Sequence, residues 1–185
     1  MVKTSLIKKI GLGSPLQDLI DTLGEVYKYV AMDLVSVGVI RGCIKPLPSK
    51  SSWLSGDTII LPHDRDEYIR LMSYVTTGLI VYNMCIGKII GLRGEIGFES
   101  CADLVMLVHL MSDCEVGSIL DNYNKLFDDL DYAAELIKMN RELLSRRIPC
   151  AFYYKLAENG SRSAVEMLKR MKCSDEDLDL TIEGL

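Results

Sequence analysis

Residues 117–147, GSILDNYNKLFDDLDYAAELIKMNRELLSRR, carry the longest periodic pattern in the chain. Residues of its main stripe recur at alternating intervals of four and three, which predicts a helix almost throughout, ended by Pro149. The recurring positions are Ile119, Tyr123, Leu126, Leu130, Ala133, Ile137, Asn140 and Leu144. Leu120, Phe127 and Ala134 widen the stripe, so it favours packing on the protein's own core. The pattern leaves open whether the chain dimerises through the seam that contains the polar Asn140.

Around this helix the sequence predicts short strands. One predicted strand lies within 35–44, where valines alternate with small residues. A second is at 58–61, after a loop that contains the single Trp53, and a third is the β-branched run at 79–92, which glycines interrupt. An aromatic run at 151–156 resembles a further strand. The expected fold is therefore α+β, a single compact domain in which a small sheet packs against several helices, including the long one.

Further helices are expected where capping residues precede an apolar stripe. These are at 14–24, from Asp64 to about Gly78, from Ser100, and from Ser163 through Met171. We expect a basic arm at 1–13, one domain at 14–173 and an acidic mobile tail at 174–185. The longest near-apolar stretch, 79–92, is interrupted by Asn83 and Lys88, and we expect it to be too short to span a membrane.

Composition and motifs favour a protein that works by contact rather than by chemistry. The chain has 185 residues, 49% hydrophobic and 25% charged, as an ordinary globular domain has. It contains no phosphate-binding loop, zinc-protease motif, paired Cys-x-x-Cys or serine elbow. His109 lies in an apolar helix and fits the core, whereas His63, beside Asp64 and Asp66, is the base that an enzyme would have to use. We expect no enzyme activity, cofactor, metal or small-molecule substrate.

The six cysteines are scattered, each in or beside an apolar run: Cys43, Cys85, Cys101, Cys114, Cys150 and Cys173. Without a recognisable signal peptide, this pattern favours reduced and mostly buried thiols. The expected location is intracellular, in the cytoplasm or nucleus, or in a virion for a viral protein.

The net charge of −5 conceals a segregation of charge along the chain. Between residues 95 and 135 there are ten acidic side chains and one basic one, and between 138 and 172 there are nine basic and three acidic ones. This gradient complements the dipole of the long helix, but it would equally supply an acidic surface and a basic surface that meet other molecules. The candidate phosphate or nucleocapsid contacts are Arg141, Arg146, Arg147, Arg162, Lys169, Arg170 and Lys172, and the candidate membrane or subunit contacts are Lys3, Lys8 and Lys9.

The basic start Ser5-Leu6-Ile7-Lys8-Lys9-Ile10-Gly11-Leu12, followed by strand, loop, helix and glycine-interrupted strand, resembles rhabdovirus matrix proteins. The resemblance covers the arm and about the next eighty residues. It implies a protein that self-associates, lies beneath a membrane and binds the nucleocapsid. The Pro-Pro-x-Tyr budding motif of that family is absent here.

Two functions follow as hypotheses. The first is a structural protein of viral matrix type that forms homo-oligomers and contacts anionic membrane and nucleoprotein–RNA through its basic residues. The second is a soluble adaptor that binds a host protein through the helical half of the chain.

Overall fold

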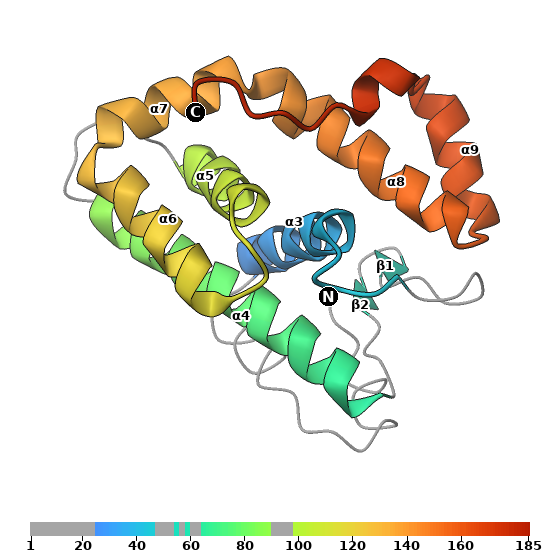
Figure 1. Cartoon of the computed structure of the whole chain (residues 1–185), viewed down its shortest axis with the longest axis horizontal. Coiled ribbons are helices and arrows are strands. Elements are labelled where there is room, and N and C mark those ends of the chain that lie inside the picture. Colours follow the sequence, from blue (N-terminus) through green and yellow to red (C-terminus); the bar gives the residue numbers. More distant parts are fainter. Residues whose placement is uncertain (1–24, 47–53, 56–57, 60–63, 90–97) are drawn as a thin grey trace.

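The computed structural model describes residues 25–46, 54–55, 58–59, 64–89 and 98–185. Its elements are α3 (Glu25–Arg41), β1 (Leu54–Ser55), β2 (Thr58–Ile59), α4 (Arg65–Ile89), α5 (Phe98–Met111), α6 (Val116–Asp128), α7 (Leu130–Met139), the π-helical turn η1 (Leu143–Arg147), α8 (Ile148–Glu158), α9 (Arg162–Met171) and the 3-10 turn η2 (Asp175–Leu178). Helices α3 and α5 lie at the centre, with α4, α6, α7 and α8 around them and α9 at one end (Figure 1).

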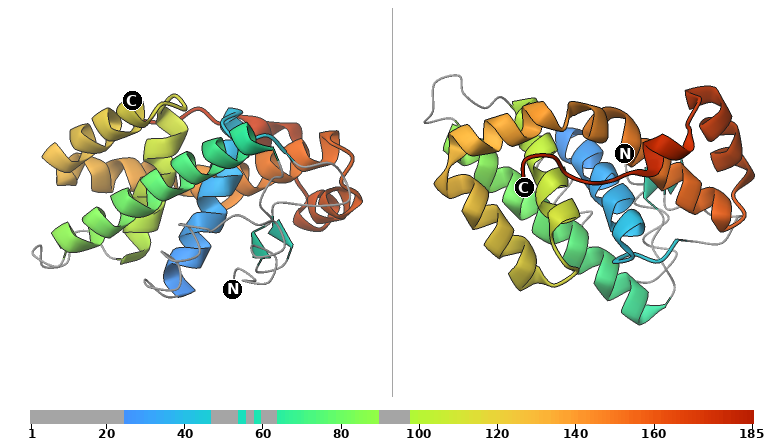
Figure 2. Two further views of the ribbon diagram at one scale, coloured as in Figure 1. Left: turned by 90° about the horizontal axis from the view of Figure 1, so that it is seen from below. Right: turned by 45° about the horizontal axis from the view of Figure 1, so that its top comes forward.

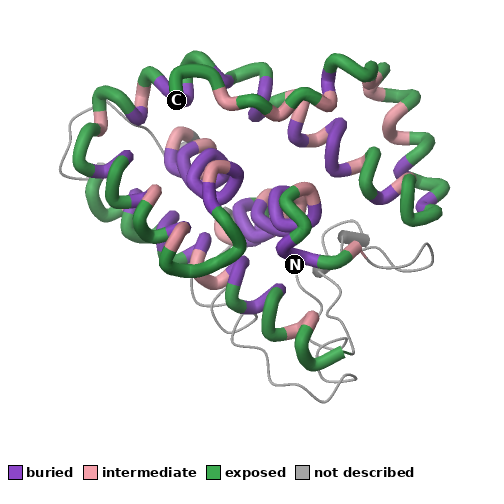
Figure 3. Tube along the Cα trace, viewed as in Figure 1, coloured by how far each residue is buried: buried purple, intermediate pink, exposed green. Residues whose placement is uncertain are grey.

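The predicted α+β fold is wrong, because the described chain is all-helical. The antiparallel pair β1–β2 has two residues on each side and is too small to form the layer on which helices would pack. Figure 3 shows the buried positions gathered on α3, α5 and the inner faces of the helices around them.

The predicted strand at 35–44 lies mostly in α3. Val35, Val37 and Val39 are all buried, because α4, α5 and α8 cover α3 from several sides. Because most of the circumference of α3 is buried, its β-branched residues are not confined to one helical stripe, and tertiary packing overrides their preference for strands. Gly38 allows the close approach of the following turn, since a methyl group there would overlap the side chain of Ile44.

Helix α4 begins as the sequence predicts and ends later. The backbone N–H of Glu67 donates to the Asp64 carboxylate at 2.9 Å, which confirms the predicted start. The helix does not stop at Gly78 but continues to Ile89, through the segment predicted as a strand. Gly78 is buried against Leu34 and His109, and a methyl group there would overlap both methyls of Leu34. This glycine therefore serves helix packing rather than termination.

Within the described ranges, α4 is the one helix long and apolar enough to cross a membrane, over Arg65–Lys88. Half of that apolar window is buried inside the protein. Packing against α3 and α5 accounts for this composition in the way expected of a core helix.

The predicted long helix at 117–147 is helical but divided. At Asp129 the backbone leaves helical geometry, and its carboxylate accepts from the N–H of Tyr132 at 3.0 Å to start α7 in a new direction. The chain then runs through η1 and on through Pro149 into α8, where the sequence predicted a strand. Pro149 stands in the first turn of α8, directly after the π-helical turn η1, and the backbone stays helical through Arg147 and Ile148, so this proline does not end the run.

All six cysteines are paired, so the prediction of reduced thiols is wrong for this structure. Cys43–Cys114 joins the end of α3 to the α5–α6 turn, Cys85–Cys101 joins α4 to α5, and Cys150–Cys173 joins α8 to the end of α9. Scattered spacing concealed these pairs, because their partners lie 16 to 71 residues apart and meet only through the fold.

The final residues, expected to be a mobile tail, are docked on the helices. After η2 the chain returns along α7, where Asn140 donates to the backbone oxygen of Glu183 at 2.9 Å and accepts from its N–H at 2.8 Å. The hydroxyl of Tyr132 donates to the oxygen of Gly184. Figure 2 shows this segment lying across the outer side of the α7–α8 run.

Candidate functional site

One end of the molecule is acidic. Five exposed carboxylates surround the junction of α6 and α7, and we call this surface the acidic end. They are Asp121, Asp128, Asp129, Asp131 and Glu135. Lys125 and Lys138 are the basic residues on the same two helices. Asp129 is the carboxylate that caps α7, which leaves the other four without a hydrogen bond or ion pair among the described residues.

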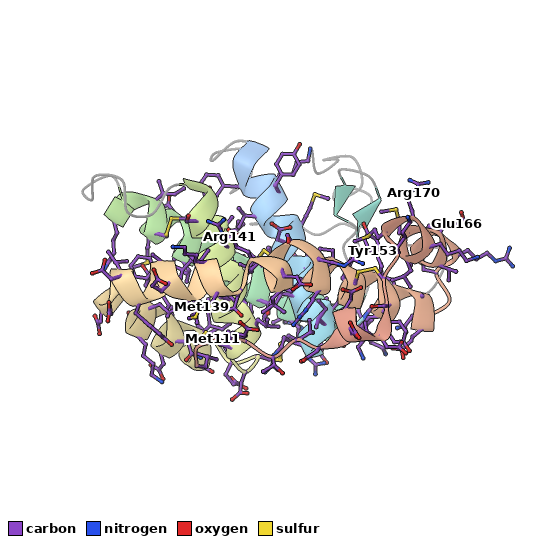
Figure 4. All side chains as sticks on the ribbon, turned by 90° about the horizontal axis from the view of Figure 1, so that it is seen from above. Met111, Met139, Arg141, Tyr153, Glu166 and Arg170 are labelled. Carbon is purple, nitrogen blue, oxygen red and sulfur yellow. A yellow bond between two sulfur atoms is a disulfide. The ribbon has the colours of Figure 1, made fainter. Side chains whose placement is uncertain are left out.

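Helix α9 lies at the opposite end of the long axis (Figure 1), and its exposed side chains make that end basic. Four exposed cations lie on and just after α9, and we call this surface the basic end. They are Arg162, Lys169, Arg170 and Lys172. None of them forms an ion pair with another described residue. Glu166 is the acid within α9 and lies at the same end of the molecule as Arg170 (Figure 4).

Helix α9 is held firmly in place. The hydroxyl of Ser161 accepts from the N–H of Ala164 and caps its start, where the sequence had predicted Ser163. At its other end Lys172 takes the left-handed conformation that closes many helices, and the Cys150–Cys173 disulfide follows. The four cations therefore stand on a rigid element rather than on a free tail.

Arg146 and Arg147 have structural partners. The guanidinium of Arg146 donates to both oxygens of Asp177, at 2.9 and 3.1 Å, and to the backbone oxygens of Met171 and Lys172. This contact lowers the pKa of Asp177 and fixes η2 against the end of α9. Arg147 lies 3.6 Å from a carboxylate oxygen of Glu142.

The remaining predicted contacts lie apart from this cluster. Arg141 stands on the α7–α8 run, away from the α9 end that carries Arg170 (Figure 4). Lys3, Lys8 and Lys9, together with His63 and Trp53, lie outside the described residues. The structure thus brings together four of the seven predicted phosphate contacts and separates them from Arg141.

The polar seam residue Asn140 is covered by the chain itself. Its side chain is buried and fully engaged with the backbone of Leu136 and of Glu183. The apolar stripe of the same segment is also internal, since Ile119, Tyr123 and Ile137 are buried in the core. The helical half therefore offers no open seam at Asn140 to a partner.

Two adjoining hollows form a groove between the central helices and the η1–α8 run. The first, of about 330 Å³, lies among α3, α5, η1 and α8, and the second, of about 520 Å³, among α5, α7 and η1. They share Asp103 and Leu144. The π-helical turn η1 borders both, and such turns are frequent at functional sites.

The groove contains a carboxylate in an unusual setting. Asp33 is half-buried, and no hydrogen bond or ion pair reaches its side chain from any described residue. Burial and, to a smaller extent, the negative charge of Asp103 raise its pKa from 3.8 to about 6. Because its lining comes from four separate elements, no sequence motif could have revealed this groove.

Other candidate chemistry in the described part of the chain is structural. His109 is fully buried with both ring nitrogens unpaired, and burial lowers its pKa to about 3, which confirms the prediction of a core histidine. It packs edge-on against Tyr74, at 4.6 Å between ring centres. Cys150, Cys173 and Asp177 lie close together, but the sulfurs are bonded to each other and the carboxylate binds Arg146.

Comparison with known proteins gives no relative. No protein-family model, curated protein or solved structure matches this chain.

Proposed function

We propose that this is a non-enzymatic structural protein that assembles head to tail, with the acidic end of one copy against the basic end of the next. The observation that carries the proposal is the placement of opposite, mostly unpaired charges at the two ends of the long axis (Figure 1). The helix dipole accounts for Lys169, Arg170 and Lys172 at the C-terminal end of α9, but Arg162 in the first turn of α9 and Asp128 at the end of α6 carry the charge that the dipole disfavours.

The two ends differ from each other, so the contact between copies would be heterologous. Such contacts generate rings or open filaments, the assemblies expected of a coat or matrix layer. Complementary charges chiefly raise the association rate and fix the orientation, and the attraction is screened beyond about 8 Å at physiological salt. Assembly is therefore expected to weaken steeply as salt is added.

The paired cysteines bear on where such an assembly would exist. Disulfides persist in oxidising surroundings, such as the exterior of cells and the surface of virions, and are rare in the cytosol. We therefore place the assembled protein in an oxidising compartment, in contrast to the cytoplasmic or nuclear location that free thiols would favour.

A second candidate function uses the same basic end. Cations without ion-pair partners on a rigid helix also suit phosphate groups, as in the matrix-type hypothesis with its nucleoprotein–RNA and anionic membrane. Flotation with phosphatidylserine vesicles, for the wild type and for a Lys3→Glu/Lys8→Glu/Lys9→Glu variant, tests the part assigned to the arm. Equal flotation of the two proteins would remove the arm from this function.

Sedimentation velocity tests the head-to-tail proposal. The wild type should form concentration-dependent oligomers at 50 mM NaCl that dissociate by about 500 mM, where screening acts within a few ångströms. The variant Arg162→Glu/Lys169→Glu/Arg170→Glu should remain monomeric at low salt.

The matched control changes the same amount of charge elsewhere. Lys45→Glu/Arg65→Glu/Arg70→Glu leaves both the acidic end and α9 untouched and should assemble like the wild type. A wild type that is monomeric at all salt concentrations, or a control that loses assembly as completely as the α9 variant, would overturn the proposal.

A further inference from the structure

The first hollow of the groove combines one charged wall with an apolar body. Its charged and polar members are Asp33, Asp103 and Ser36. Its apolar members are Met32, Met106, Leu144, Ile148, Pro149, Phe152 and Tyr153. At about 330 Å³ it has the size of a site for a small organic molecule.

The electrostatics of the hollow favour a cation. Asp33 and Asp103 are close enough for the charge of one to act on the other, and the Asp33 carboxylate has no hydrogen-bond donor among the described residues. A buried carboxylate without a donor is costly, and a positively charged N–H donor would relieve that cost. The hydroxyl of Ser36 donates to the backbone oxygen of Met32 at 3.1 Å, and its lone pairs remain able to accept.

The apolar side of the hollow favours an organic cation over a metal ion. Phe152 and Tyr153 lie with ring centres 5.4 Å apart on α8, and the thioethers of Met32 and Met106 lie on α3 and α5. Aromatic faces attract ammonium groups, whereas a hard divalent cation needs six or more oxygen ligands. With two carboxylates and one hydroxyl, such an ion would keep several water ligands, and the apolar wall of the hollow offers those waters no hydrogen-bond partner.

We propose that this hollow binds a primary organic amine, with its ammonium group between Asp33, Asp103 and Ser36 and its hydrocarbon body against Met32, Met106 and the rings of α8. The site lies on the η1–α8 side of the molecule, away from the cations of α9. It is therefore independent of the head-to-tail proposal.

Isothermal titration calorimetry of the full chain in 500 mM NaCl, where the protein is expected to be monomeric, tests this site. The probe is 2-phenylethylamine, and 2-phenylethanol is the neutral probe of the same shape. The amine should bind at least about tenfold more tightly than the alcohol, since a charge-assisted contact adds about that factor. At pH 6, binding should release protons, because a bound ammonium stabilises the ionised form of Asp33. Asp103 and Tyr153 line the same hollow, and Arg141 lines the adjoining one.

The variant Asp33→Asn keeps the shape of the hollow and removes the charge. It should bind the amine at least about tenfold more weakly and release no protons, while Asp175→Asn, an exposed change in η2, should bind like the wild type. Equal binding of amine and alcohol by the wild type, or equal amine binding by the wild type and Asp33→Asn, would overturn the assignment. Because Asp33→Asn is expected to stabilise the fold, a loss of binding would not reflect unfolding.

Discussion

The central helices and the C-terminal run are held together by different kinds of contact. Helices α3, α4 and α5 meet through close apolar packing that leaves the polar atoms of Tyr74 and His109 unpaired. The run from α7 to the chain end is fixed by polar contacts to backbone, those of Arg146 and Asn140. Close packing of apolar side chains therefore determines how the central helices fit together. Hydrogen bonds from individual side chains determine how the C-terminal run, which includes the basic end, is held.

Removal of disulfides should have the largest effect on the free energy of unfolding, and the two regions should respond differently. Cys43→Ala/Cys114→Ala opens a loop of 71 residues and should cost about 4 kcal/mol, whereas Cys150→Ala/Cys173→Ala opens one of 23 and should cost about 3 kcal/mol. Urea unfolding measures both values. Hydrogen exchange should rise throughout the protein in the first variant and chiefly in α9 in the second. Similar exchange patterns in the two variants would contradict the division.

Gly78→Ala tests whether shape specifies the core. The added methyl group would overlap the methyls of Leu34 beside His109, so we expect a loss of about 3 kcal/mol in the free energy of unfolding. Gly87→Ala on the same helix meets no atom within 4 Å and should instead stabilise by up to about 1 kcal/mol through helix propensity. Urea unfolding of both variants in parallel measures the contrast, and equal stability of the two would show that the packing at Gly78 is not tight.

Asp33→Asn should raise stability, and the size of the gain should depend on pH. The pKa of Asp33 in the folded protein, about 6, lies above 3.8, so the native state holds this proton more tightly than the unfolded chain does. Its contribution to stability therefore falls as pH rises from about 4 to about 6. The variant should match the wild type below pH 4 and exceed it by about 3 kcal/mol above pH 6.5. Urea unfolding between pH 3.5 and 7.5 in 500 mM NaCl measures the difference, and a constant difference would contradict it. Both proteins retain His109, whose lowered pKa makes stability rise with pH, so its effect cancels in the comparison.

The smallest effect is expected at the docked chain end. Asn140→Leu removes the side chain that bonds both backbone groups of Glu183, and should cost about 1 kcal/mol. Hydrogen exchange at the amide of Glu183 should accelerate, while that of α3 and α5 stays unchanged. An unchanged rate at Glu183 would show that other contacts dock the tail.

The sequence predicted local features well and long-range partners poorly. The Asp64 cap and the buried His109 follow from patterns within a few residues, and both are confirmed. The sequence predicted a strand within α3 because a helix buried over most of its circumference shows no clear apolar stripe.

Other features depend on partners far along the chain. The role of Arg146 is set by Asp177, 31 residues later, and the disulfide pairs are likewise set by the fold. Four of the predicted phosphate contacts do share one short helix, with Arg162 in its first turn and Lys169, Arg170 and Lys172 at its end. The groove at Asp33 escaped prediction, since it arises where four elements meet.

The most direct test of head-to-tail assembly is to exchange the charges of the two ends and mix the products. One variant carries Asp128→Lys/Asp131→Lys/Glu135→Lys at the acidic end, and the other carries Arg162→Glu/Lys169→Glu/Arg170→Glu at the basic end. Sedimentation velocity at 50 mM NaCl should find each variant monomeric alone and oligomers restored in an equimolar mixture, since every contact then again joins opposite charges. Oligomers in either variant alone, or a mixture that stays monomeric while the wild type assembles, would contradict the account.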